Sequence, residues 1–241
     1  MKAECGTDIG SVRQSNQDAC ACDVLKENIA WGIVCDGMGG VSGGSVASSL
    51  ALKAIRDELE QLKDKSMPKD MCDFLNAAIQ KANAIVYKTS VEMPELSGMG
   101  TTAVVLVAYK NTLHTIHVGD SRAYLKNAGG LIKLTKDHSY VQNLVDLGQI
   151  TSDEARIHPK RNIITRAIGV KDDVLADYST HTFKPGDCAI ACTDGLTNYV
   201  DDETLSSYIE KYQSDELIQK LIDFAVEAGG ADNISAVAIY A

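Results

Sequence analysis

Aspartates at the ends of apolar, strand-like runs are the residues of this sequence best suited to chemistry. Asp36 follows WGIVC, Asp120 follows TIHVG and Asp194 follows AIACT. Asp232 precedes NISAVAIY, and Asp18 introduces another short apolar stretch. One aspartate at a turn is ordinary, but several carboxylates on one rim would repel each other unless divalent cations bound between them. Because all these ligands are oxygens, we expect Mg²⁺ or Mn²⁺ rather than zinc or copper.

Apolar runs rich in β-branched residues are predicted to position these aspartates. We expect strands at 29–35, 101–109, 112–118, 122–126, 131–135, 188–192 and 234–240. Four consecutive runs are joined by the short turns KN, GDS and NAGG, which predicts one antiparallel meander. Amphipathic spacing predicts paired helices between the blocks of strands, at 45–62, 69–89, 202–211 and 214–228.

The lack of polar alternation in the main strands decides the expected architecture. It is clearest in the runs 29–35, 102–108, 188–192 and 234–239. Both faces of such strands must be covered. Antiparallel sheets covered on both faces imply two sheets packed together, with helix pairs outside. We therefore expect an α+β fold, built as a four-layer α/β/β/α sandwich.

Composition limits the classes of function. The chain has 241 residues, 45% of them hydrophobic, and shows no repeat or long linker, so one domain over residues 1–241 is expected. A net charge of −10 argues against a nucleic-acid partner. No apolar run reaches the length of a membrane span and no apolar leader is visible, which predicts a cytoplasmic protein without a membrane partner.

The seven cysteines form no CxxC pair, and most lie in apolar runs. They are expected to be buried free thiols in a reducing compartment. A zinc site on Cys20 and Cys22 is disfavoured, because the spacing is wrong and no second pair follows.

Eight sequence blocks occur in one order along nearly the whole chain. They are GSVRQSNQDA (10–19), CDGMGG (35–40), GMGTTAVV (98–105), VGDSRAY (118–124), LTKDHS (134–139), HPKRNIITRAIG (158–169), ACTDGL (191–196) and DNISAV (232–237). In these blocks the chain resembles the metal-dependent Ser/Thr protein phosphatases (the PPM or type 2C family) in their compact bacterial form. The resemblance implies the same four-layer fold.

The resemblance also implies a centre for two catalytic Mn²⁺ or Mg²⁺ ions. Asp36 would bridge both ions, and the carbonyl of Gly37 would join the second. Asp194 and Asp232 would complete the shell of the first ion, with Asp18 in the outer shell through water. Glycine next to the bridging aspartate leaves the backbone carbonyl accessible for such a role.

A third metal and a phosphate ligand follow from the same resemblance. Asp120, with Asp194, would hold the third ion typical of bacterial members, and Arg13 matches the phosphate-binding arginine. The implied reaction is direct attack of the metal-bridging water on phosphoserine or phosphothreonine, with Asp36 and Arg13 as catalytic residues. Arg13 would form a charge-assisted fork on the phosphoryl oxygens.

Two positions depart from the family pattern. Gln17 stands where many eukaryotic members carry a glutamate that reaches the second metal, so this metal is expected to bind more weakly. Met38 stands where those enzymes carry a histidine proposed as general acid, and methionine donates no proton. His138 and His158 are alternative donors, but a helix start and a mobile flap are the favoured interpretations of their positions.

Residues 148–165 match the flap that lies beside the active site in this family. Lys160 and Arg161 in this segment form one of the few cationic pairs of an acidic protein. They either receive an anionic phosphoprotein or are solvated loop charges.

Other functions fit less well. A nucleotide-binding interpretation of DGMGGVSGGS lacks both GK[ST] and GxGxxG, and no cysteine lies in a CX5R loop as in thiol phosphatases. A catalytically weak binding module and a partner-switching phosphatase of a transcription regulator remain as alternatives. The favoured hypothesis is a stand-alone, monomeric phosphatase of phosphoproteins that opposes a bacterial Ser/Thr kinase, its partners being that kinase and its substrates.

Overall fold

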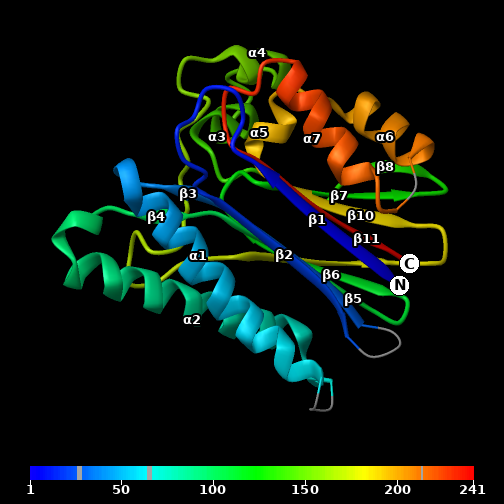
Figure 1. The fold of residues 1–241 in the computed structure, drawn as a ribbon, viewed down its shortest axis with the longest axis horizontal. Helices are drawn as coiled ribbons and strands as arrows, with labels where there is room; N and C mark the ends of the chain where they lie inside the picture. Colours follow the sequence, from blue (N-terminus) through cyan, green and yellow to red (C-terminus); the bar gives the residue numbers. More distant parts are fainter. Residues whose placement is uncertain (26–28, 64–66, 213) are drawn as a thin grey trace.

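Two antiparallel sheets form the centre of the molecule (Figure 1). The structure is a computed structural model and describes residues 1–25, 29–63, 67–212 and 214–241. One sheet has the order β1 (Lys2–Asp8), β11 (Ile234–Tyr240), β10 (Cys188–Cys192), β7 (Arg122–Asn127) and β8 (Gly130–Lys133). The other has the order β2 (Asp18–Leu25), β3 (Ile29–Met38), β5 (Ala103–Tyr109), β6 (Thr112–Val118) and β9 (Asp177–Thr182), and β4 (Gly100–Thr101) pairs with β3.

Helices cover the outer faces of both sheets (Figure 1). On the β3 sheet they are α1 (Gly40–Leu59) and α2 (Met71–Glu92), with the 3₁₀ turns η1 (Glu60–Lys63) and η2 (Pro94–Leu96). On the β11 sheet they are α5 (Asp194–Thr197), α6 (Asp202–Lys211) and α7 (Leu217–Glu227). Two short helices, α3 (Tyr140–Asp146) and α4 (Ser152–Ile157), lie between β8 and β9 in the sequence. The predicted α/β/β/α sandwich is confirmed.

Three apolar clusters separate the four layers, as the missing alternation in the strands predicts. In β3, Trp31 and Ile33 pack toward α1 and α2, whereas Ala30 and Val34 pack between the sheets. Leu106 lies in the same intersheet layer and is fully buried. Truncating such a leucine to alanine typically costs about 2–5 kcal/mol. The alternation matters for the site, because it directs every second residue of β3 into the space between the sheets.

The prediction of a single four-stranded meander is wrong. β5 and β6 pair in one sheet and β7 and β8 pair in the other, so the chain crosses between the sheets at Gly119, Asp120 and Ser121. Gly119 has φ +105°, and a Cβ there would lie 2.5 Å from Thr102 Cγ2. The crossing thus requires glycine at this position, and it places Asp120 where the two sheets meet.

Some boundaries differ from those expected. The run predicted at 101–109 is divided into β4 and β5, and the first helix begins at Gly40 rather than 45. β1 and β9 were not expected, because their sequences KAECGTD and DYSTHT are largely polar. Both are edge strands of their sheets, and their side chains are exposed or only partly buried, so they need no apolar sequence. Within the residues that the structure describes, no helix is long and apolar enough to cross a membrane.

Candidate metal centre

The five aspartates come together at one rim of the sandwich. Asp18 and Asp36 are register partners on β2 and β3. Asp120 lies in the crossing between β6 and β7, Asp194 begins α5 with one residue between it and β10, and Asp232 is separated from β11 by Asn233. Because residues 30 and 34 of β3 face the intersheet space, the same alternation directs Asp36 to the mouth of that space.

A cavity of about 600 Å³ lies over this rim. Its lining includes four of the five aspartates, the other predicted site residues and departures, and two residues of the flap segment: Asp36, Asp120, Asp194, Asp232, Arg13, Gln17, Gly37, Met38, Asn162 and Ile164. Asp18 is not part of the lining. Its Oδ2 accepts a hydrogen bond from Thr193 Oγ1 at 2.9 Å, behind the cavity wall. This position fits the outer-shell role that the sequence implied for Asp18.

Burial and mutual repulsion act on these carboxyls. Burial, reinforced by Asp194, raises the pKa of Asp120 to about 7. Burial also raises the pKa of Asp18 to about 7, although hydrogen bonds from Ser235 and Thr193 oppose the shift. The pKa of Asp36 is raised by burial and then by the neighbouring carboxylates, and that of Asp194 by burial and then by Asp232. The centre is therefore short of positive charge.

One arginine compensates part of this charge. Arg13 Nη2 lies 2.8 Å from Asp232 Oδ2, and the Arg13 side chain is 54% exposed. Arg122 also acts on Asp120 and Asp194, but it is paired with Asp137, so the two guanidinium groups do not neutralise four carboxylates. Divalent cations would fit the remaining oxygens, because hard ions prefer carboxylate and carbonyl ligands. The arrangement is suited to holding Mg²⁺ or Mn²⁺ against a phosphate that Arg13 can reach.

The backbone of Asp36 is fixed by two threonines. Its N–H donates to Thr102 Oγ1 at 2.9 Å, and its carbonyl accepts from the Thr102 N–H and Thr101 Oγ1, each at 2.9 Å. Thr101 and Thr102 are both buried. They support the site by fixing the backbone of Asp36, and Thr102 is also part of the cavity lining.

Glycine is required next to Asp36 because the first turn of α1 packs against it. A Cβ at Gly37 would lie 2.1 Å from the carbonyl oxygen of Gly44 and 2.4 Å from that of Gln17. The Gly37 N–H donates to the Gln17 carbonyl at 3.1 Å. The Gln17 side chain in turn donates from Nε2 to the Gly40 carbonyl at 2.9 Å. Gln17 therefore joins the loop before β2 to the start of α1 at the cavity edge.

Asn233 fastens the loop that carries Arg13. Its Nδ2 donates to the carbonyls of Ile9 and Ser15, at 2.9 and 3.1 Å, and its Oδ1 accepts from the Gln17 N–H at 2.8 Å. Asn233 is 5% exposed. Sequence reasoning did not identify this residue, because its partners are backbone groups distant in the sequence.

Neither candidate proton donor reaches the cavity. His138 is buried and bonded to Gly119, as described below, and His158 Nδ1 accepts from the Lys160 N–H at 3.1 Å. Neither histidine is part of the cavity lining, which includes Met38. His138 lies directly before the N-cap of α3, Ser139, as the sequence predicted.

The segment 148–165 borders the cavity on one side. It contains α4, whose start has a capping box between Thr151 and Glu154, and its end brings Asn162 and Ile164 to the cavity. Lys160 Nζ lies 5.1 Å above the ring of Tyr140. A second hollow of about 570 Å³ continues past Asp120, Asn162 and Asp194, and Arg156 and Arg161 contribute to its lining.

Comparisons with known proteins agree with this geometry. The sequence profile of the family described as Protein phosphatase 2C matches residues 6–234. The serine/threonine protein phosphatase PstP of Mycobacterium tuberculosis is 37% identical over 96% of this chain, which spans only 43% of that relative's length. A putative protein phosphatase 2C-type of Streptococcus pyogenes is 36% identical, with 100% of this chain and 97% of the relative covered.

Solved structures give the same result. The S. agalactiae serine/threonine phosphatase superposes with a TM-score of 0.90 at 33% identity, covering 99% of this chain and 98% of the other. The catalytic domain of PstP, solved in complex with two manganese ions, superposes with a TM-score of 0.85 at 33% identity, covering 98% and 96%.

Proposed function

This chain belongs to the protein phosphatase 2C family, and we propose that it is a metal-dependent phosphatase that hydrolyses phosphoserine and phosphothreonine on proteins. The observation that carries this proposal is the single cavity in which four aspartates and Arg13 meet. A family match alone would not distinguish an active enzyme from a binding module, whereas the intact set of carboxylates favours catalysis.

The residues fit two catalytic ions and a third. Asp36 would be shared by the first two ions, with Asp194 and Asp232 on the first and the Gly37 carbonyl on the second. Asp120 and Asp194 would hold the third. A Mn²⁺ or Mg²⁺ pair supplies a water of lowered pKa as nucleophile near neutral pH and neutralises phosphoryl charge. The two manganese ions named for the structure of the PstP catalytic domain support this assignment.

The chain's own residues orient the substrate. The half-exposed Arg13 can turn from Asp232 to the phosphoryl oxygens and bind two of them through its planar guanidinium. Asn233 holds the loop that carries Arg13, so the arginine is presented at a fixed place over Asp36. Methionine at position 38 offers no proton to the leaving group, so water in the cavity or another group would supply that proton.

The finer assignments follow from the proposed reaction. Residues 1–241 would be one catalytic domain, with the flap at 148–165. A phosphopeptide would lie over the cavity and extend into the second hollow, where Arg156 and Arg161 lie. The partners would be phosphoproteins, among them a Ser/Thr kinase and its substrates, in the cytoplasm, and the protein would act as a monomer. The net charge of −10 supports the exclusion of nucleic acid.

Hydrolysis of a phosphothreonine peptide by the purified protein tests the proposal. Release of phosphate is expected with Mn²⁺ and should stop with EDTA. Asp36→Asn is expected to remove activity while leaving the thermal transition in place, and Asp73→Asn, an exposed aspartate on α2, is the matched control. Mn²⁺ binding without phosphate release would instead favour the binding module.

A further inference from the structure

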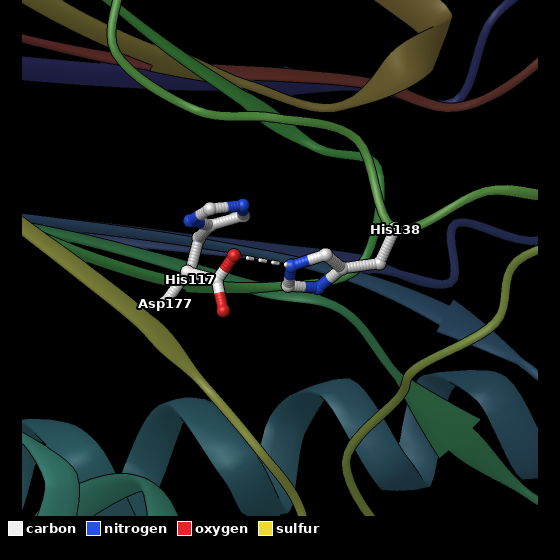
Figure 2. A group of neighbouring side chains, drawn as sticks. All are labelled: His117, His138 and Asp177. Carbon is white, nitrogen blue, oxygen red and sulfur yellow. Dashed lines mark hydrogen bonds and ion pairs between the residues drawn. The ribbon is translucent and has the colours of Figure 1, made fainter. Parts of the chain in front are cut away.

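Two histidines and an aspartate gather behind the crossing that carries Asp120. Figure 2 shows His138 and Asp177 facing each other, with the ring of His117 beside them. Their ligand atoms lie within 4.8 Å of one another, as in a metal site. However, the rings of His117 and His138 are stacked, with centroids 4.6 Å apart and planes 17° apart. Ring lone pairs lie in the ring planes, so two nearly parallel rings cannot aim at one ion.

The positive charge in this cluster comes from an arginine rather than from a metal ion. Arg166 Nη1 lies 2.7 Å from Asp177 Oδ1 and 3.1 Å from His138 Nε2. Burial opposes ionisation of Asp177, but hydrogen bonds from His138 and Arg166 lower its pKa overall. The three groups therefore form a hydrogen-bonded network with its own charge balance, and a role other than metal binding has to explain it.

The hydrogen bonds of the His138 ring fix its tautomer. The Gly119 N–H lies 3.1 Å from Nδ1, and a backbone N–H can only donate, so Nδ1 is the acceptor. The proton is therefore on Nε2, which lies 3.2 Å from Asp177 Oδ2 and donates to it. Arg166 Nη1 can only donate, so its 3.1 Å approach to the protonated Nε2 is a contact without a hydrogen bond, and Arg166 acts on the ring through Asp177. Burial lowers the pKa of His138, in agreement with a neutral ring. Asp177 thus holds the ring in the tautomer that can accept from Gly119.

His138 forms hydrogen bonds with both the N–H and the carbonyl of Gly119. Its own N–H donates to the Gly119 carbonyl at 2.9 Å, while its ring accepts from the Gly119 N–H. The next residue is Asp120, so these two bonds set the orientation of the peptide from which the Asp120 side chain leaves. The His138 carbonyl also accepts from the Thr165 N–H at 2.8 Å, which ties the end of the flap to the same point.

We propose that His138 is a positioning residue for the third metal, acting through Gly119 to hold Asp120, with Asp177 and Arg166 fixing its ring. The proposal rests on the proposed function in one respect, namely that Asp120 is a metal ligand. Within His138, the Nδ1 acceptor positions Gly119, whereas the bulk of the ring and its bond to Asp177 do not do so directly.

Two amide variants separate these contributions. The Oδ1 of an asparagine lies near the position of Nδ1, so His138→Asn can still accept from Gly119 but cannot reach Asp177. The amide of a glutamine lies near the position of Nε2, so His138→Gln keeps the bond to Asp177 and loses the acceptor for Gly119. His138→Gln is expected to raise the Mn²⁺ concentration at half-maximal binding of the weakest ion by about fivefold to tenfold. His138→Asn should stay within about twofold of the original protein.

Calorimetric titration with Mn²⁺ alone measures this shift without relying on activity. The effect should vanish when Asp120→Ala is already present, because nothing remains to be positioned. An equal shift in both amide variants, or a shift that persists beside Asp120→Ala, would overturn the proposal. Loss of peptide hydrolysis with normal Mn²⁺ binding would count against the proposed function instead. If one variant does not fold, the other still decides, since His138→Asn must bind Mn²⁺ within about twofold of the original protein and His138→Gln must bind it more weakly.

Discussion

The substitution Asp120→Asn is expected to stabilise the metal-free protein, and this stabilisation should increase as the pH rises. Burial raises the pKa of this group from 3.8 to about 7. Between these two values the folded state holds a proton that the unfolded chain has released, so raising the pH favours unfolding. A shift of about three units corresponds to up to about 4 kcal/mol once the pH exceeds 7. Asp120→Asn has no proton to lose and avoids this cost.

Urea unfolding in EDTA at pH 5, 6, 7 and 8 would measure the effect. The difference in unfolding free energy, variant minus original protein, should grow by about 2–3 kcal/mol over this range. Burial lowers the pKa of His114, His117 and His138, which makes both proteins gain stability as the pH rises to about 6.5, and this contribution cancels in the difference.

The exposed Asp73 provides the control, since Asp73→Asn makes the same substitution outside the cluster of carboxyls. Saturating Mn²⁺ should reverse the order of stability, because only the original protein keeps every carboxylate for binding, and binding to the folded state stabilises it. A difference that is flat, or that falls with pH in EDTA, would refute the argument that Asp120 is held in a low-dielectric cluster of carboxyls.

Three further outcomes are expected. Arg13→Ala should raise KM for a phosphothreonine peptide by about tenfold or more in steady-state kinetics at saturating Mn²⁺, because a charge-assisted contact with phosphate is lost; an unchanged KM would contradict this. Gln17→Glu should lower the Mn²⁺ concentration needed for half-maximal activity, since it adds a carboxylate at the cavity edge; an unchanged or higher midpoint would contradict this. Cys5 should be the first thiol alkylated by iodoacetamide and Cys35 among the last, as peptide mapping can show: hydrogen bonds from Cys20 and Cys22 lower the pKa of the exposed Cys5, whereas burial raises that of Cys35.

Much of the fold follows from the sequence because burial on both faces leaves a visible pattern. The strands expected at 112–118, 188–192 and 234–240 have those bounds in the structure. The error at the GDS turn has a different origin. A short turn between two strands looks the same whether the strands pair or separate, and only the pairing partners of β6 and β7 reveal the crossing.

The site was predictable to the extent that its residues carry charge. Aspartates at strand ends are conspicuous, and all five lie at one rim. Asn233 and His138 are not conspicuous, because their contribution consists of hydrogen bonds to backbone groups distant in the sequence. Such contacts depend on how the loops come together, and no local pattern encodes them.

The pairing of β1 with β11 bears on how the molecule folds. Lys2 lies opposite Tyr240, and β11 lies between β1 and β10. This sheet is therefore complete only when the first and last strands of the sequence have paired. Contacts between such distant residues carry a large loop-closure entropy and are formed slowly. The five aspartates span positions 18 to 232, so no shorter folding intermediate contains them all. Tight Mn²⁺ uptake during refolding should therefore report completion of the whole domain rather than of any part of it.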